Sequence, residues 1–410
     1  MSLDVDFVRA QFPGLQSPWA LFDNAGGSVP ARPVIERTTH YMQNRAVQLG
    51  ASYGRSQSAE ADVRAGEAAA ALLLGASTRE SIVSHSTTMG FRTLAAGIGP
   101  TLDAGDEVVV TNLDHAANIV SWRRMAAQHD LVLHEWKLRP ETASLHVDDL
   151  AEMLGPKTRL VTFTQCANVV GELIDVPRIV DVIRNNRKDT IVIADGVAYA
   201  PHRQMDVAAL GVDAYAASLY KVYGPHLGVV YGRESLLLAA HGQNHDFIPE
   251  DRLPYKFQPG NVTHELTAGL LGITDYLDSV AAHHEIQFTD ARQRHGAVFE
   301  AFAAHEATLC ARLLEGLLKH DAVTVIGPHT PDPDVRVPTV AFTISGRRAS
   351  EIPPLFDPHG IALRSGNFYA PGAIDALGLE ESGGVARASL VHYNTLDEVD
   401  RFLAVLADVI

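Results

Sequence analysis

The chain has 410 residues, of which 46% are hydrophobic and 20% are charged. A chain of this length and composition folds around a sizeable core, which excludes a wholly disordered protein and predicts more than one domain. Lysine and arginine number 33 against 49 acidic residues, a net charge of −16, so we expect neither a nucleic-acid partner nor attraction to anionic membranes.

Cysteine is scarce in this chain. Cys166 and Cys310 are too few for a disulfide framework or a four-cysteine zinc site, and a reducing compartment explains their scarcity. The first residues are acidic, without the basic and apolar pattern of a signal peptide, and no apolar run reaches the ~18 residues of a membrane span. We therefore expect a cytoplasmic protein without a membrane-spanning segment.

Short runs of β-forming residues alternate with helical patterns between residues 81 and 231. Several runs are almost continuously apolar, which is typical of strands whose two faces are both covered by helices. Helices are expected at 59–74, before a capping Gly75, and at 176–186. The predicted strands are 81–84, 107–111, 131–136, 159–164, 190–194, 214–217 and 228–231. The pattern predicts an α/β fold with a mostly parallel central sheet.

The pattern changes after residue 253, where strands and helices no longer alternate regularly. The elements predicted there are helices at 263–282, 306–320 and 349–356, strands at 339–344 and 385–392, and a last helix that opens with a capping box, Thr395 to Glu398. These elements are typical of a smaller α+β domain. The predicted division is an N-terminal segment at 1–20, a large domain at 21–275 and a small C-terminal domain at 276–410.

Two residues that follow predicted strands have the chemistry of a catalytic centre. Asp195 follows the apolar run 190–194, and ligands of open α/β sheets gather at the carboxyl ends of strands. Lys221 lies between apolar runs, and a buried lysine that loses its proton becomes a nucleophile towards aldehydes. The alternatives are a helix-capping or turn acid at 195 and an exposed turn lysine at 221.

Two further features favour a cofactor site. Ser86, Thr87 and Thr88 lie between a strand and a helical pattern, where N–H groups and hydroxyls form an anion cup, although ordinary helix caps look the same. His115 follows the strand 107–111 and has a ring to stack on a flat cofactor, although a structural histidine is the more common role. Pyridoxal 5′-phosphate (PLP) needs an amine, a carboxylate, an anion cup and a stacking group, so the features together predict PLP.

Two segments of the chain resemble a known family. Asp195-Gly-Val-Ala, His202 and the segment 218–225, Ser-Leu-Tyr-Lys-Val-Tyr-Gly-Pro, are similar to the class V aminotransferases and to their cysteine-desulfurase-like subgroup. The resemblance extends from residue 21 to residue 395. It implies the fold type I of PLP-dependent transferases, as in aspartate aminotransferase. It also implies a homodimer with active sites at the interface, where the loop 257–261 reaches the neighbour's phosphate.

The resemblance implies a role for each matching residue. Lys221 would form the Schiff base with PLP and move protons at the substrate Cα, Asp195 would pair with the pyridinium nitrogen, and His115 would stack on the ring. The expected contacts to the phosphate and the ring hydroxyl come from Thr87, Thr88, Asn168, Ser218, Tyr220 and Asn261. The expected anchors of an amino-acid substrate are Arg387, Arg364 and Asn24.

The segment 364–370, Arg-Ser-Gly-Asn-Phe-Tyr-Ala, departs from the desulfurase pattern. Desulfurases carry in this segment the cysteine that attacks the substrate sulfur, and here Tyr369 takes its place. A phenol with a pKa of about 10 cannot accept sulfur as a thiolate does, and neither cysteine of this chain substitutes for it. Ala198 also stands where the family has a glutamine that contacts the ring hydroxyl.

We therefore expect a PLP-dependent enzyme that acts at the Cα of an amino acid through Lys221. Lyase or transaminase chemistry is favoured over sulfur transfer, with racemisation or a non-catalytic PLP-fold scaffold as alternatives. The 19 histidines suggest a metal hydrolase as a further alternative. The sequence contains no HExxH motif, however, and we expect no metal site.

Overall fold

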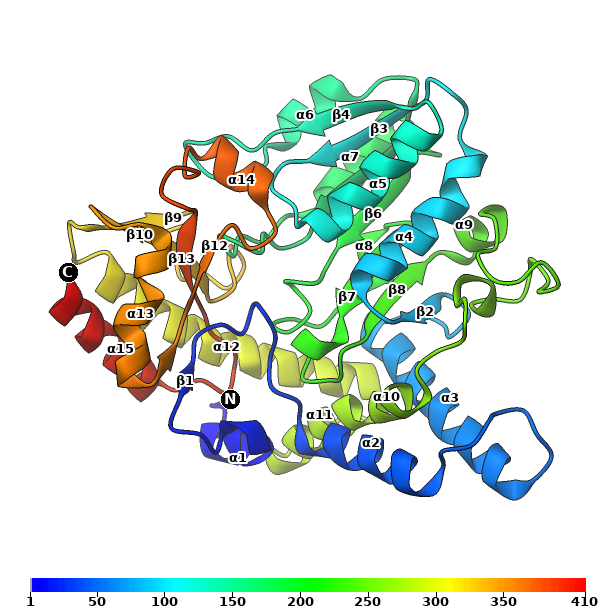
Figure 1. Cartoon of the computed structure of the whole chain (residues 1–410), viewed down its shortest axis with the longest axis horizontal. Coiled ribbons are helices and arrows are strands. Elements are labelled where there is room, and N and C mark those ends of the chain that lie inside the picture. Colours follow the sequence, from blue (N-terminus) through cyan, green and yellow to red (C-terminus); the bar gives the residue numbers. More distant parts are fainter. Residues whose placement is uncertain (1) are drawn as a thin grey trace.

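A seven-stranded sheet forms the centre of the molecule, in the order β2-β8-β7-β6-β5-β3-β4 (Figure 1). The computed structural model describes residues 2–410. Strand β8 is antiparallel to both of its neighbours, and the other pairs are parallel, so the predicted mostly parallel α/β sheet is confirmed. The strands are β2 (Ser81–Ser84), β3 (Glu107–Thr111), β4 (Val132–Trp136), β5 (Thr158–Thr164), β6 (Ile191–Asp195), β7 (Ala214–Ser218) and β8 (Gly228–Gly232).

Neighbouring residues of the apolar strands point into two different cores. Val108 and Val110 of β3 pack with Phe91 and Trp122, which belong to the helices α4 (Thr87–Ile98) and α5 (Ala116–Gln128) on the near side of the sheet in Figure 1. Val109 packs in the core on the other face. The helices of that core include α3 (Gly54–Leu74), α7 (Val176–Asn186), α8 (Val207–Leu210) and α11 (Leu271–His283). This two-sided burial explains the continuous apolar runs in the sequence.

A second, antiparallel sheet has the order β12-β13-β10-β9 and its own core. Its strands are β9 (Val323–Ile326), β10 (Thr339–Ile344), β12 (Arg364–Gly366) and β13 (Val385–Ser389). The helices α13 (Pro353–Phe356) and α15 (Leu396–Val409) pack in this core. Beside it, β1 (Ala20–Leu21) pairs in parallel with β11 (Ile361–Ala362) and so ties the N-terminal region to this part of the chain.

Helix α12 (Ala291–Leu317) belongs to both cores. Phe299 and Phe302 pack with the large core, whereas Leu309 and Leu313 pack with the small one, and in Figure 1 the helix extends from the small sheet towards the large one. The division of the chain at 275/276 stays a prediction. It lies within α11, whose side chains pack in the large core.

Several predicted elements have other bounds in the structure. The helix expected at 263–282 is two helices, α10 (His264–Gly269) and α11, separated at Leu270. The helix expected at 306–320 begins fifteen residues earlier, at Ala291, because the apolar face continues through the first half of α12. The strand expected at 385–392 ends at Ser389, and the chain then turns so that Val391 packs in the large core. Two consecutive prolines interrupt the helix expected at 349–356.

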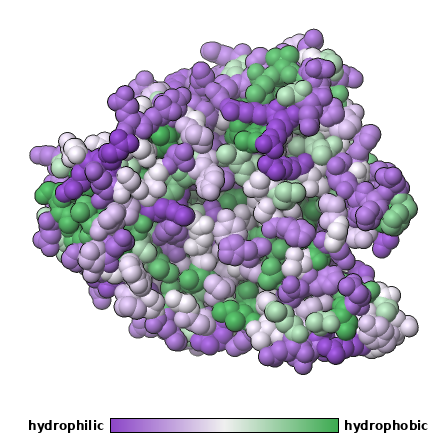
Figure 2. Space-filling model, viewed as in Figure 1, coloured by the Kyte–Doolittle hydropathy of each residue, from purple (hydrophilic) through white to green (hydrophobic). Residues whose placement is uncertain are grey.

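The remaining helices are short or mostly polar, and the sequence pattern did not single them out. They are α1 (Val5–Ala10), α2 (Arg32–Asn44), α6 (Val147–Met153), α9 (Glu234–Ala239) and α14 (Pro371–Ala376). On the face shown in Figure 2, hydrophobic residues lie in separate groups rather than in one continuous patch. Among residues 2–410, no helix combines the length and the hydrophobicity that crossing a membrane requires.

Candidate active site

Two adjoining cavities lie where β5, β6 and β7 end. The inner cavity has a volume of about 80 Å³ and the outer cavity about 270 Å³, and His115, Asn168, Tyr220 and Lys221 line both of them. The inner cavity brings together the residues expected at the cofactor, namely Thr87, Thr88, His115, Asn168, Asp195, Ser218, Tyr220 and Lys221. The outer cavity adds Arg364 and Arg387 from the small sheet. The site therefore combines the edge of the large sheet with side chains from the small one.

Lys221 is a buried lysine in a short 3-10 turn (Leu219–Lys221) that follows β7. The Oγ of Ser28 donates hydrogen bonds to the carbonyls of Tyr220 and Lys221, which fixes this turn. Burial lowers the pKa of the Lys221 amine to about 8, and the positive charge of Arg387 acts in the same direction. A substantial fraction of the amine is therefore neutral near physiological pH, as a nucleophile or proton acceptor must be.

Asp195 is the last residue of β6, and 96% of its surface is buried. Its Oδ1 accepts a hydrogen bond from the Val197 N–H at 2.9 Å. Burial raises the pKa of this carboxyl to about 6, whereas the Val197 N–H and the charge of Lys221 lower it. The next residue, Gly196, has no room for a side chain, because a Cβ there would lie 1.7 Å from the Tyr215 hydroxyl. A cationic group in the inner cavity would therefore stabilise the ionised form of Asp195.

His115 is the N-cap of α5 and stays neutral. Its Nδ1 accepts a hydrogen bond from the Ala117 N–H at 3.0 Å, which leaves the ring proton on Nε2. Burial, followed by the charges of Lys221 and Arg387, lowers the pKa of His115 to about 4. The ring of Tyr369 lies 5.3 Å from it, centre to centre. The site therefore holds His115 as a fixed, uncharged ring at the junction of the two cavities.

The first turn of α4 forms a cup at the inner cavity. Ser86 caps the helix, and its Oγ accepts a hydrogen bond from the Met89 N–H. Thr87 Oγ1 lies 2.7 Å from Ser218 Oγ, so the two hydroxyls form one polar group on the wall. Gly228 packs against this turn, where a Cβ would lie 2.3 Å from the Thr87 nitrogen. Free N–H groups at a helix start, with hydroxyls beside them, favour an anion such as phosphate.

Asn168 and Tyr220 complete the shared wall. The Nδ2 of Asn168 donates to the Phe368 carbonyl at 2.9 Å, and its buried Oδ1 has no partner among residues 2–410. The ring of Tyr220 stacks on His226 at 4.7 Å, with only 6° between the ring planes. Asn168 therefore offers a free acceptor to a ligand, and Tyr220 offers a hydroxyl on a fixed ring.

Arg387 is the buried cation of the outer cavity. Its Nη1 donates to the Asn168 carbonyl at 2.8 Å, and its guanidinium lies 3.8 Å from the centre of the Phe368 ring. Burial lowers its pKa to about 10, but the group remains charged at neutral pH. Its Nε is buried and has no partner within the described chain. A fixed guanidinium with a free donor is suited to bind a carboxylate.

Sequence reasoning missed Asp23 and Phe368. Asp23 contacts both arginines, at 3.3 Å from Nη2 of Arg387 and 3.4 Å from Nη1 of Arg364. Phe368 and Tyr369 both have positive φ angles, of 50° and 58°, and both line the outer cavity. The sequence gives no local signal for the role of Asp23, because the tertiary fold brings it to two arginines that lie more than 300 residues further along the chain.

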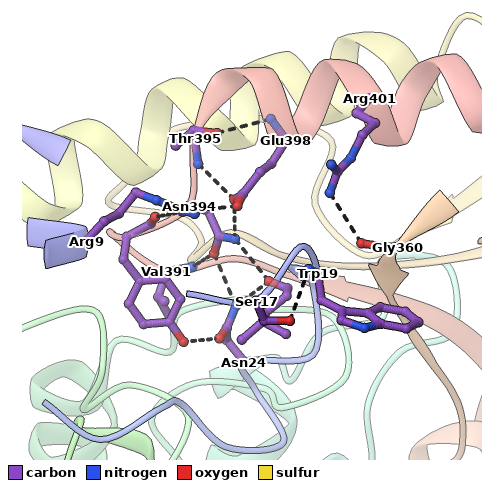
Figure 3. Close-up of polar contacts among 12 residues, drawn as sticks. Arg9, Ser17, Trp19, Asn24, Gly360, Val391, Asn394, Thr395, Glu398 and Arg401 are labelled. Carbon is purple, nitrogen blue, oxygen red and sulfur yellow. Dashed lines mark hydrogen bonds and ion pairs between the residues drawn. The ribbon is translucent and has the colours of Figure 1, made fainter. Parts of the chain in front are cut away.

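Two expected site residues lie elsewhere. Asn24 does not line either cavity, because its buried amide donates to the carbonyls of Leu21 and Ser389 and to Asn394, while its carbonyl accepts from Tyr393. Figure 3 shows that Asn24 and Asn394 are bonded to each other within a network that includes the capping box of α15. The side chain of Asn24 therefore lies outside both cavities in this structure, and its substrate-binding role stays a prediction. Its neighbours Ala25 and Gly26 line the outer cavity instead.

Asn261 lies on a different surface of the molecule. It lines a separate hollow of about 320 Å³ with residues of α3, and its Nδ2 lies 3.3 Å from His264 Nε2. Its backbone is left-handed, with φ 70°, which an asparagine tolerates better than most residues. In this chain, Asn261 does not line the inner cavity.

Both thiols are buried and protonated. Cys166 lines the inner cavity, and burial raises its pKa to about 12. Cys310 lies on the apolar face of α12, in the core of the small sheet, and burial raises its pKa as well. A thiol must be a thiolate to act as a nucleophile, so neither side chain has the properties of a sulfur acceptor.

Comparisons with known proteins agree with this geometry. A family model described as Aminotransferase class-V matches residues 20–402. Among curated proteins, the Aminotransferase-like protein FGM3 of Gibberella zeae is 36% identical, over 99% of this chain and 98% of that protein. The Cysteine desulfurase-like protein ustD of Aspergillus flavus is 31% identical, over 100% of this chain and 91% of that protein.

Solved structures show the same fold. The cysteine desulfurase CsdA of Escherichia coli superposes with a TM-score of 0.84 and 25% identity, over 100% of this chain and 98% of that one. Its fold is the fold type I of PLP-dependent enzymes, as expected from the sequence. The chain therefore belongs to the class V aminotransferase family, which, like the cysteine desulfurases, depends on PLP.

Proposed function

We propose that this protein is a PLP-dependent enzyme that acts at the Cα of an amino acid through Lys221. The proposal rests on the composition of the inner cavity, which combines the amine of Lys221 with its lowered pKa, the buried carboxylate of Asp195 and the anion cup at Thr87. The adjoining outer cavity is lined by two arginines. A structural role for the fold gives no reason to bury an amine with a lowered pKa beside an open cavity.

The residues of the inner cavity fit PLP. The cup at Thr87 and Thr88 is suited to the phosphate, and Asp195 to a protonated ring nitrogen, since a cation beside it stabilises the charged form of a buried carboxyl. The unpartnered Oδ1 of Asn168 would accept a hydrogen bond from the ring hydroxyl. Ala198 has no side-chain polar group, so the contact to the ring hydroxyl would come from Asn168.

The chain's own groups divide the work of proton transfer and binding. When bound, PLP withdraws electrons from the substrate Cα and so makes its proton acidic. Lys221 is the group suited to take and return that proton, because its amine loses its own proton near pH 8. Arg387 would hold the α-carboxylate through its free Nε, and the neutral His115 would cover the site without adding charge.

We favour a lyase or aminotransferase outcome over sulfur transfer. The position that desulfurases give to cysteine belongs here to Tyr369, which is 71% exposed at the mouth of the outer cavity. The buried thiol of Cys166 stays protonated, so it does not replace the missing group. Tyr369 then acts as a wall of the cavity beside His115.

A homodimer is the second part of the proposal. Members of the family are commonly dimeric. The position of Asn261, in a hollow outside the inner cavity, suits a loop that contributes to the site of a neighbouring subunit. Size-exclusion chromatography with light scattering tests this proposal: a single species of about 88 kDa, twice the 44.2 kDa of the chain, supports it, and a monomer contradicts it.

The test of the function is a product analysis. The purified holoprotein is incubated with each amino acid, and mass spectrometry identifies a keto acid, a D-isomer, or the products of a lost side-chain group. Lys221→Ala should abolish every such product, whereas the exposed control Lys188→Ala should leave them unchanged. If no amino acid is converted, or if Lys221→Ala works as well as the wild type, the proposal is wrong.

A further inference from the structure

The outer cavity is cationic in a strongly acidic protein. Lys221, Arg364 and Arg387 line it, and no carboxylate does, although the chain has a net charge of −16. Asp23 lies behind the lining, where its two carboxylate oxygens contact one arginine each. One negative charge thus offsets one of two permanent positive charges, and the cavity retains an unbalanced cation for a ligand.

The two arginines stand side by side. Arg364 of β12 and Arg387 of β13 are directly paired in an antiparallel ladder, so their Cα atoms lie about 5 Å apart and their side chains leave the same face of the sheet. Like charges in this position repel each other, and Asp23 is the one acidic residue among residues 2–410 that forms an ion pair with both. The arrangement is one that a second anion would stabilise.

The surroundings of the two guanidinium groups differ. Arg387 is 2% exposed and is held by Asn168, Asp23 and the Phe368 ring, with only its Nε unpartnered. Arg364 is 61% exposed, and its contact with Asp23 is a single ion pair at 3.4 Å. Arg387 is therefore fixed for one carboxylate at the buried end, while Arg364 keeps most of its donors for a second group nearer the mouth.

We propose that the substrate is an amino acid with a carboxylate on its side chain. Arg387 binds the α-carboxylate and Arg364 the distal carboxylate, and Asp23 positions both arginines. This inference rests on the proposed function and narrows it. The charges agree with it, because a dicarboxylic amino acid carries a net charge of −1, which matches the cation that Asp23 leaves unbalanced. The cavity volume of about 270 Å³ is sufficient for a short side chain.

The experiment compares isosteric pairs of substrates. The holoprotein is assayed with aspartate against asparagine and with glutamate against glutamine, which differ only in the distal charge. The acidic member of at least one pair should have a kcat/KM about tenfold higher, as one charge-assisted hydrogen bond in a half-open cavity provides. Arg364→Gln should bring the ratio close to one, whereas Arg79→Gln, a surface arginine paired with Glu234, should leave it unchanged.

A binding measurement tests the same claim without turnover. Calorimetry of the holoprotein should show succinate binding about tenfold more tightly than its monoamide, and Arg364→Gln should remove the difference. Equal affinity for the two compounds, or a difference that survives in Arg364→Gln, would overturn the inference. Equal use of the acid and its amide in both pairs, in a reaction that requires Lys221, would refute this substrate class alone. Turnover that persists in Lys221→Ala would instead refute the proposed function.

Discussion

Lys221→Met is expected to stabilise the cofactor-free protein while it abolishes activity. The folded-state pKa of Lys221 is about 8, against an ordinary value of 10.5. At about 1.4 kcal/mol per pH unit, this gap corresponds to about 3 kcal/mol by which folding disfavours the protonated amine. Methionine has a similar length and no charge, so it removes this cost.

The pH dependence follows from the sign of that gap. Because the folded pKa is lower, the unfolded chain binds the proton more tightly, and the stability of the wild type rises as the pH increases from about 8 to 10.5. At pH 7 the amine is protonated in both states, so the free energy of unfolding of the wild type is lowered by the full amount. The advantage of Lys221→Met should therefore be up to about 3 kcal/mol at pH 7 and should shrink by pH 10, as measured by urea unfolding of the apoprotein.

Lys256 provides the matched control. Its side chain is also buried, but its Nζ donates to the Ala240 carbonyl at 2.8 Å and to Glu250 at 2.9 Å. Lys256→Met leaves both acceptors without this donor, so it should destabilise the protein by about 1–3 kcal/mol at pH 7. If Lys221→Met destabilises the apoprotein as Lys256→Met does, then Lys221 is not an uncompensated buried charge and the reasoning fails.

Three further predictions concern the carboxylate anchor, the acid beside His115 and the phosphate cup. Arg387→Gln should lower kcat/KM about 10- to 100-fold in a steady-state assay, because it removes a buried charge-assisted contact; an unchanged value would contradict its role. Asp114→Asn should stabilise the apoprotein by about 1–3 kcal/mol at pH 8 and by less at pH 5, because burial raises the pKa of Asp114 from 3.8 to about 7 and the cost of ionising this carboxyl accumulates between these two pH values; equal urea midpoints at pH 8 would count against it. Gly228→Ala should weaken PLP binding about tenfold in a fluorescence titration, because its Cβ meets the Thr87 nitrogen at 2.3 Å; wild-type affinity would show that the cup is not the phosphate site.

The strands and the inner cavity could be predicted from the sequence because local signals define them. Continuous apolar runs mark strands that are buried on both faces, and the residue that follows such a strand lies at the sheet edge where ligands bind. Asp195 and Lys221 could be placed together by this rule alone. The capping box at Thr395 and Glu398 is equally local, and both of its hydrogen bonds are present.

The outer cavity could not be predicted in the same way. Its special feature is the contact of Asp23 with two arginines, and this contact depends on the pairing of β12 with β13 and on the path of the chain after β1. The surroundings of Asn24 could not be predicted for a related reason. The sequence identifies a polar residue near the site, but only the tertiary fold shows that its amide is already bonded to other parts of the chain.

The central claim is that the amine of Lys221 holds PLP and carries out the chemistry at Cα. Borohydride reduction of the holoprotein, followed by proteolysis and mass spectrometry, tests it most directly. The account predicts a pyridoxyl-phosphate adduct on the peptide that contains Lys221, which disappears when an excess of a converted amino acid is added before reduction. An adduct on another lysine, or none at all in protein that still converts an amino acid, would contradict the account.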